Sequence, residues 1–112
     1  MADIKPLAFR GSALRDLKSF PSTAQRKAGV QLRMVQLGLA PSDWKPMTVI
    51  GSGVIEIRIN DAGNAYREIY LAKFTNAIYV LHCFQKKSEK TSKLDIDIGS
   101  QRFKELLKDL RP

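Results

Sequence analysis

The sequence predicts a small α+β domain in which a twisted antiparallel sheet carries an N-terminal helical hairpin and a C-terminal helix. Three observations predict this class. Apolar residues follow helical spacing over residues 12–39, strand-like alternation replaces it over residues 47–86, and helical spacing returns near residue 92. The chain has 112 residues, a length that suits one core. We therefore expect residues 1–112 to form a single domain.

The composition indicates a folded and strongly basic protein. Hydrophobic residues make up 44% of the chain and charged residues 27%, a balance typical of globular proteins and unlike that of disordered ones. The 19 Lys and Arg residues exceed the 11 Asp and Glu residues, so the formal net charge is +8. A surplus of this size favours polyanionic partners, nucleic acid first among them.

Several classes of protein and site are disfavoured. No apolar stretch approaches the ~20 residues of a membrane span, and the start MADIKPLAFRG lacks the apolar segment of a signal peptide. We therefore expect a cytoplasmic protein without a membrane partner. Cys83 is the only cysteine and His82 the only histidine, so we expect no intrachain disulfide, no metal site and no cofactor.

The N-terminal third contains signals for a short strand and two helices. KPLAF at residues 5–9 suits an edge strand. Ser12 suits the N-cap of a first helix, which Pro21 ends. Ser22 and Gln25 form a capping-box pattern for a second helix. The apolar stripe of that helix consists of Ala24, Ala28, Leu32, Val35 and Leu39.

The sheet is expected from four segments. MTVI at residues 47–50 is short and partly β-branched, and VIEIRIN at 54–60 alternates isoleucine with polar residues. The turn DAGN then predicts a hairpin with AYREIYLAK at 65–73. AIYVLHCFQ at 77–85 has apolar residues in both alternating sets, which indicates a strand covered on both faces at the centre of the sheet.

A last helix is expected after a run of lysines. Ser92 suits its N-cap, Asp95 lies in its first turn, and Gly99 weakens its middle. Its apolar stripe consists of Ile96, Phe103, Leu107 and Leu110.

Two arginines of the predicted hairpin are the first candidate functional residues. If Asp61 pairs with Asn64 across the turn, Arg58 lies opposite Arg67 on one face of the sheet. Two adjacent like charges favour a bound anion. Two alternatives stay open: a slip of one residue separates the pair, or the arginines form cross-strand ion pairs with the glutamates at positions 56 and 68.

The stretch after the last strand adds further cations. Lys86, Lys87 and His82 are candidate catalytic residues for cleavage of RNA, in which the 2′-hydroxyl attacks the adjacent phosphorus and negative charge builds up on the phosphoryl oxygens. A lysine crowded by cations loses its proton more easily and can act as a general base or acid. Alternatively, His82 is a structural histidine and the lysine run is a solvated loop. Candidate RNA-binding residues are Gln85, Lys90 and Lys93.

Four motifs together resemble the phage-derived, HigB-like branch of the RelE/ParE toxin superfamily. They are GSALRDL at a helix start, QLGLAP at a helix end, YREIY in the hairpin and IYVLHCFQKK at the last strand. The resemblance covers nearly the whole chain. It implies a RelE-like fold with helices packed on one side of the sheet.

The resemblance also implies a function. It indicates the toxin of a type II toxin–antitoxin system, a metal-independent endoribonuclease that cuts mRNA on the ribosome and inhibits translation. The partner would be a helix-turn-helix antitoxin, held in a hetero-oligomer. The implied residues that grip the phosphate are Arg58, Arg67, Lys86 and Lys87. The C-terminal SQRFKELLKDLRP lacks the tyrosine or histidine that such nucleases often place there. The alternatives are a ParE-like gyrase poison and a non-catalytic nucleic-acid-binding module.

Overall fold

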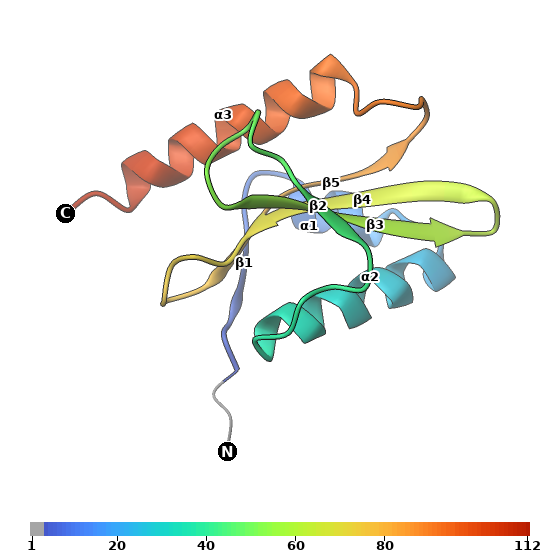
Figure 1. The fold of residues 1–112 in the computed structure, drawn as a ribbon, viewed down its shortest axis with the longest axis horizontal. Helices are drawn as coiled ribbons and strands as arrows, with labels where there is room; N and C mark the ends of the chain where they lie inside the picture. Colours follow the sequence, from blue (N-terminus) through green and yellow to red (C-terminus); the bar gives the residue numbers. More distant parts are fainter. Residues whose placement is uncertain (1–3) are drawn as a thin grey trace.

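A computed structural model describes residues 4–112 and shows, within them, a five-stranded sheet with three helices (Figure 1). The predicted α+β class is confirmed. In chain order the elements are β1 (Leu7–Phe9), α1 (Ala13–Lys18), α2 (Ser22–Gln36), β2 (Trp44–Pro46), β3 (Val54–Asp61), β4 (Asn64–Leu71), β5 (Ile78–Lys86) and α3 (Lys93–Asp109).

The strand order in the sheet is β1-β5-β4-β3-β2. Neighbours from β5 to β2 are antiparallel, whereas β1 runs parallel to β5. The sheet is therefore mixed. From β1 at one edge of the sheet, the chain passes through α1 and α2 and enters β2 at the opposite edge. The central position belongs to β4. The prediction of β5 as the centre was wrong, although β5 does lie between two strands.

Helices cover both faces of the sheet. Figure 1 shows α3 on one side of the strands and α2 on the other. Two separate hydrophobic clusters fill the two interfaces: the α1–α2 side includes Leu32, Ile57 and Val80, and the α3 side includes Ile69 and Leu106. The expectation of helices on one side was therefore wrong. This arrangement explains the apolar run of β5, since both of its faces are buried.

The N-terminal helices follow the predicted stripe, and one of the two predicted N-cap residues is at the cap position. Ala24, Ala28, Leu32 and Val35 are buried, whereas Leu39 lies beyond the end of α2 and is 57% exposed. Ser12 occupies the N-cap position of α1, as predicted, but its hydroxyl makes no capping hydrogen bond. It donates to Asp16 and accepts from Arg102, and so joins α1 to α3. The N-cap of α2 is Pro21, and Ser22 already lies inside the helix.

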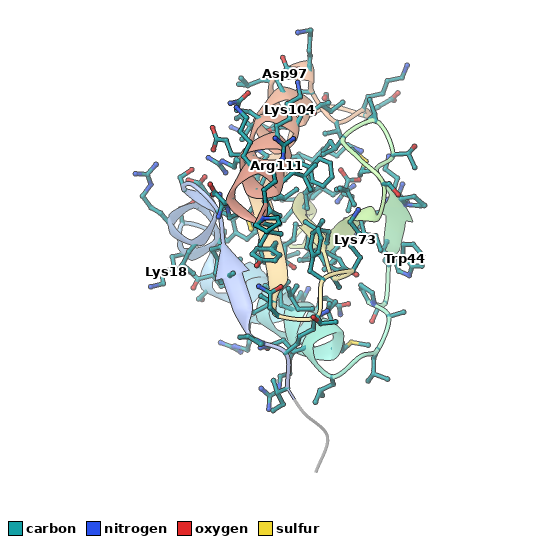
Figure 2. All side chains as sticks on the ribbon, turned by 90° about the vertical axis from the view of Figure 1, so that its left-hand side faces the viewer. Lys18, Trp44, Lys73, Asp97, Lys104 and Arg111 are labelled. Atoms are coloured by element: carbon teal, nitrogen blue, oxygen red, sulfur yellow. The ribbon has the colours of Figure 1, made fainter. Side chains whose placement is uncertain are left out.

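The edge strand β2 lies earlier in the chain than predicted. It consists of Trp44–Pro46, and Figure 2 shows Trp44 at the margin of the molecule. MTVI instead forms a turn over β3, in which the Met47 N–H donates to the Val54 carbonyl at 2.8 Å. Pattern reading missed β2 because three residues with an exposed tryptophan and a proline carry no apolar alternation.

The cap of α3 is confirmed, since Ser92 Oγ accepts from the Asp95 N–H at 3.1 Å. Its stripe is only partly as predicted, because Leu107 and Leu110 are 37% and 36% exposed while Leu106 is fully buried. Gly99 is buried as well, and a Cβ there would lie 2.8 Å from Ile50 Cδ1. Glycine at this position thus permits the close approach of α3 to the sheet.

Candidate functional site

The β3–β4 hairpin sets the register of the candidate site. Asp61 pairs with Asn64, and the two-residue turn between them contains Ala62 at φ 50° and Gly63 at φ 79°. Both residues adopt positive φ, as in the type I′ turns that match the twist of a hairpin. This turn places Arg58 directly opposite Arg67. The predicted register is confirmed, and the two side chains share one face of the sheet.

Four basic residues from four strands lie on that face, which is the face covered by α3. Lys45 of β2 pairs with Glu56, Arg58 of β3 pairs with Arg67 of β4, and Lys86 of β5 pairs with Ala65 beside Arg67. Figure 1 shows the hairpin extending past the start of α3, while Thr91, in the segment between β5 and α3, contacts Glu56 on this part of the sheet. We name the group the cation cluster: Lys45, Arg58, Arg67 and Lys86.

A buried carboxylate lies within the cation cluster. Glu56 is 0% exposed, and its Oε1 lies 3.6 Å from Arg67 Nε and 3.8 Å from Lys45 Nζ. The Thr91 hydroxyl donates to its Oε2 at 2.9 Å. A buried charge requires such partners. One cross-strand ion pair considered for the arginines is therefore present, and it ties the segment after β5 to the sheet.

The two arginines differ in exposure. Arg67 is 7% exposed, its Nη1 donates to the Tyr66 carbonyl at 2.9 Å, and burial lowers the pKa of its guanidinium. The Arg58 side chain is 37% exposed, and its nearest carboxylate among residues 4–112 is that of Asp43 at 4.0 Å. Arg58 is therefore able to contact a ligand, whereas the buried Arg67 contributes its positive charge to the site.

Lys86 is half-buried, as is Lys45, the other lysine of the cluster. Desolvation, followed by the charge of Arg67, lowers the pKa of the Lys86 ammonium group, and Glu56 opposes this shift. Lys86 and Lys87 both line an open depression of about 630 Å³ beside the hairpin turn. A lysine with a lowered pKa has a larger fraction of neutral amine near neutral pH than an ordinary lysine, and that amine can accept a proton.

The other predicted RNA-binding residues lie around the cluster, not in it. Gln85 pairs with Tyr66 and so points to the opposite face, the α1–α2 side of the sheet. Lys90 is exposed in the segment before α3. Lys93 is exposed at the start of α3 and lies 2.9 Å from Asp97.

His82 lies on the same face as Lys86 but is buried. It is 4% exposed, its Nε2 lies 2.7 Å from Asp95 Oδ1, and its ring stacks on Phe84 with a centroid distance of 4.8 Å. Burial lowers its pKa, although the bond to Asp95 opposes the shift. Phe84, the next residue on this face, stands between His82 and Lys86 along β5. This environment matches the structural alternative for His82.

Sequence reasoning considered Glu56 only as an ion-pair partner of the arginines, and it missed Lys45 and Thr91. Glu56 shares the alternation set of Arg58, so its face was readable but its burial was not. Lys45 was missed because β2 was not recognised. Thr91 comes from an irregular segment, and only the tertiary structure brings it to Glu56.

Glu68, the other glutamate of the hairpin, points to the opposite face. It is 0% exposed, it pairs with Ile57 and Cys83, and among residues 4–112 its carboxyl has no hydrogen-bond partner. Burial raises its pKa well above the ordinary value for glutamate. Glu68 is therefore not a counterion for Arg67, since consecutive strand residues point to opposite faces.

A family model described as Phage derived protein Gp49-like (DUF891) matches residues 15–104, most of the chain. The chain belongs to this family. The Gp49-like family lies within the RelE/HigB-like toxin superfamily, and its members are commonly toxins of toxin–antitoxin pairs. Membership supports a toxin role and an antitoxin partner for this Gp49-like protein. No curated protein matches the chain. None of the helices within residues 4–112 is long and apolar enough to cross a membrane.

Proposed function

We propose that this Gp49-like protein is a HigB-like, cytoplasmic endoribonuclease toxin that cuts mRNA on the translating ribosome. A helix-turn-helix antitoxin neutralises it. The observation that carries the proposal is the pairing of Arg58 with Arg67, with Lys86 alongside, on the part of the sheet that extends past the start of α3. Cations held in fixed positions stabilise the charge that develops on a phosphoryl group in the transition state.

In the proposed reaction the 2′-oxygen of a nucleotide attacks the adjacent phosphorus. The new P–O bond closes a cyclic phosphate, while the bond to the 5′-oxygen of the next nucleotide breaks. Lys86, whose pKa is lowered, takes the proton of the 2′-hydroxyl. Arg58 binds the phosphoryl oxygens. The leaving 5′-oxygen receives a proton from solvent or from a second lysine, Lys87.

Other residues support this reaction. Arg67 adds positive charge beneath the phosphate, and Glu56 holds its guanidinium in place at 3.6 Å. Gln85, Lys90 and Lys93 bind the flanking RNA or ribosomal RNA as an electrostatic contact. His82 positions Phe84 and the start of α3.

The test is to map transcript ends after a short pulse of expression. Wild type is expected to produce new internal ends in translated mRNA, and Arg58→Ala is expected to reduce them at least 100-fold. Arg33→Ala, an exposed arginine on α2, is the matched control and should cut normally. Arg67→Ala is less suitable because it leaves Glu56 buried without its partner.

Other outcomes reject the proposal. Intact transcripts with a DNA-damage response would identify a gyrase poison. Intact transcripts without such a response would indicate a binding module that lacks catalysis. Undiminished cleavage by folded Arg58→Ala would remove the cation cluster from the reaction.

A further inference from the structure

The outer edge of β3 is only partly covered. β2 pairs with residues 55–57 of β3, and the Arg58 N–H donates to the Asp43 carbonyl at 2.8 Å. Beyond Arg58, no strand among residues 4–112 pairs with this edge. Since backbone groups alternate in direction along a strand, the N–H and carbonyl of Asn60 point outward like those of Arg58. An unpaired edge of this kind is a template for another strand.

A groove of about 430 Å³ runs between this edge and α2. Arg26 and Lys27 line it from α2, and Arg58 lines it from β3. Its apolar part is formed by Val30, which is 55% exposed, and by Ile59. The remaining lining residues are Thr23, Gln31 and Asn60. The groove therefore combines three cations, an apolar surface and an open strand edge.

These features favour an acidic extended polypeptide over RNA. An added strand uses the backbone groups at the edge, places alternate apolar side chains on Val30, and brings acidic side chains to Arg26 and Lys27. Single-stranded nucleic acid usually stacks on aromatic side chains. No aromatic residue is among those that line the groove within residues 4–112.

Lys27 occupies the edge in the unbound protein. Its Nζ donates to the Asn60 carbonyl at 2.9 Å and lies 3.0 Å from Asp61 Oδ1. Lysine at an exposed edge is a common protection against unwanted pairing. The side chain is 55% exposed, so a partner carboxylate can draw the ammonium away and free the carbonyl.

We propose that an acidic, extended segment of the antitoxin binds in this groove as a sixth strand, paired with residues 58–60 of β3. Arg58 belongs both to this groove and to the cation cluster. The bound segment takes the Arg58 guanidinium away from the phosphate and so silences the toxin directly. The binding site stands on the geometry of the edge, while its inhibitory effect rests on the proposed function of Arg58.

The probe for this site is a synthetic peptide of about ten residues that alternates valine and glutamate. Amide chemical shifts of the labelled, full-length protein are followed during titration. We expect changes at residues 58–60 and on the groove side of α2, with hydrogen exchange of the Asn60 amide slowed at least tenfold. Arg26→Glu should weaken binding at least tenfold. Arg33→Glu, an exposed arginine outside the groove lining, should bind like wild type.

Two further probes separate strand pairing from simple charge attraction. The same peptide with alternate amides N-methylated keeps its charges but loses its edge hydrogen bonds, and it should bind at least tenfold more weakly. Equal binding of both peptides would overturn the proposal. So would a ten-nucleotide oligouridylate that binds the same residues and displaces the peptide, because the groove would then be an RNA site.

The inhibitory step has its own readout. The peptide should lower mRNA cleavage in proportion to its occupancy of the groove. If cleavage is absent altogether while the peptide still binds at residues 58–60, the proposed nuclease function fails and the binding site stands. If cleavage continues with the groove saturated, the role of Arg58 as a shared residue is rejected.

Discussion

Arg58 and Arg67 face each other directly across β3 and β4, at a position where the two strands exchange no hydrogen bonds and side chains come closest. Like charges at such a position destabilise a sheet. Glu56 compensates only for the buried Arg67, at 3.6 Å. Arg58 keeps its guanidinium partly exposed, and within the described residues no carboxylate lies nearer to it than that of Asp43 at 4.0 Å. The sheet thus carries an unfavourable pair whose cost a bound phosphate would offset.

Removing the charge of Glu56 should destabilise the fold. Glu56→Gln leaves the buried Arg67 without its counterion and weakens the bond from Thr91. We expect a loss of about 3 kcal/mol in the free energy of unfolding, measured by urea denaturation. Glu89→Gln, in the exposed segment after β5, should change it by less than about 0.5 kcal/mol. A neutral effect of Glu56→Gln would show that the ion pair contributes little.

Lys86 should determine the pH dependence of cleavage. A general base must be deprotonated, so the cleavage rate should rise with pH. Because the pKa of Lys86 is lowered, the rate should reach its plateau at a pH below the ordinary pKa of lysine. Lys86→Arg should lose this rise and cut at least 100-fold more slowly, as measured by transcript cleavage between pH 6 and 9. Lys104→Arg, at an exposed lysine of α3 outside the site, is the control and should keep the wild-type profile. An unchanged profile in Lys86→Arg would assign the proton transfer elsewhere.

Glu68 should make the protein less stable as pH rises. Burial raises the pKa of Glu68 in the folded state. The contribution of protonated Glu68 to the free energy of unfolding is therefore fully present below the pKa of glutamate in the unfolded chain, and it is lost as pH rises toward the pKa in the folded state. The contribution of one proton is about 1.4 kcal/mol per pH unit within that window. Glu68→Gln should remove this slope in urea denaturation measured from pH 4 to 8. Parallel curves for wild type and variant would mean that Glu68 ionises normally.

The contact between the turn after β2 and α3 should tolerate no added methyl group. A Cβ at Gly51 would lie 2.2 Å from Cε2 of the Phe103 ring. Gly51→Ala should therefore cost about 1–3 kcal/mol in thermal or urea unfolding. Gly29→Ala adds a methyl group on α2 with no atom within 4 Å and should stabilise the protein by about 0.5–1 kcal/mol. Equal effects of the two variants would contradict the packing of α3 on this turn.

The strands with strong alternation were readable from the sequence. Local signals fixed β3, β4 and the turn between them, so the opposition of Arg58 and Arg67 followed from two-residue hairpin geometry alone. β1 and β2 have three residues each, and their pairing depends on the rest of the fold. The parallel pairing of β1 could not be predicted, because no local signal encodes which distant strand it meets.

The candidate site was only half predictable. The hairpin register placed the side chains of Arg58 and Arg67 on one face, but it gave no measure of burial. Glu56 belongs to the polar set of the alternating strand and is nevertheless fully buried. His82 looked available for catalysis and is instead enclosed between Phe84 and Asp95. Burial depends on loops and helix ends, such as residues 87–92, whose paths follow from tertiary packing.

The most direct test compares two double variants in cleavage of mRNA on purified ribosomes. Arg58→Ala/Lys86→Ala removes two members of the cation cluster, and Arg33→Ala/Lys104→Ala removes the same charges from the exposed surfaces of α2 and α3. We predict that the first variant cuts at least 1,000-fold more slowly than wild type while unfolding at a similar urea concentration, and that the second cuts normally. Equal loss of cleavage in both variants would mean that net charge alone drives the effect, and normal cleavage by the first would contradict the cation cluster as the phosphate site.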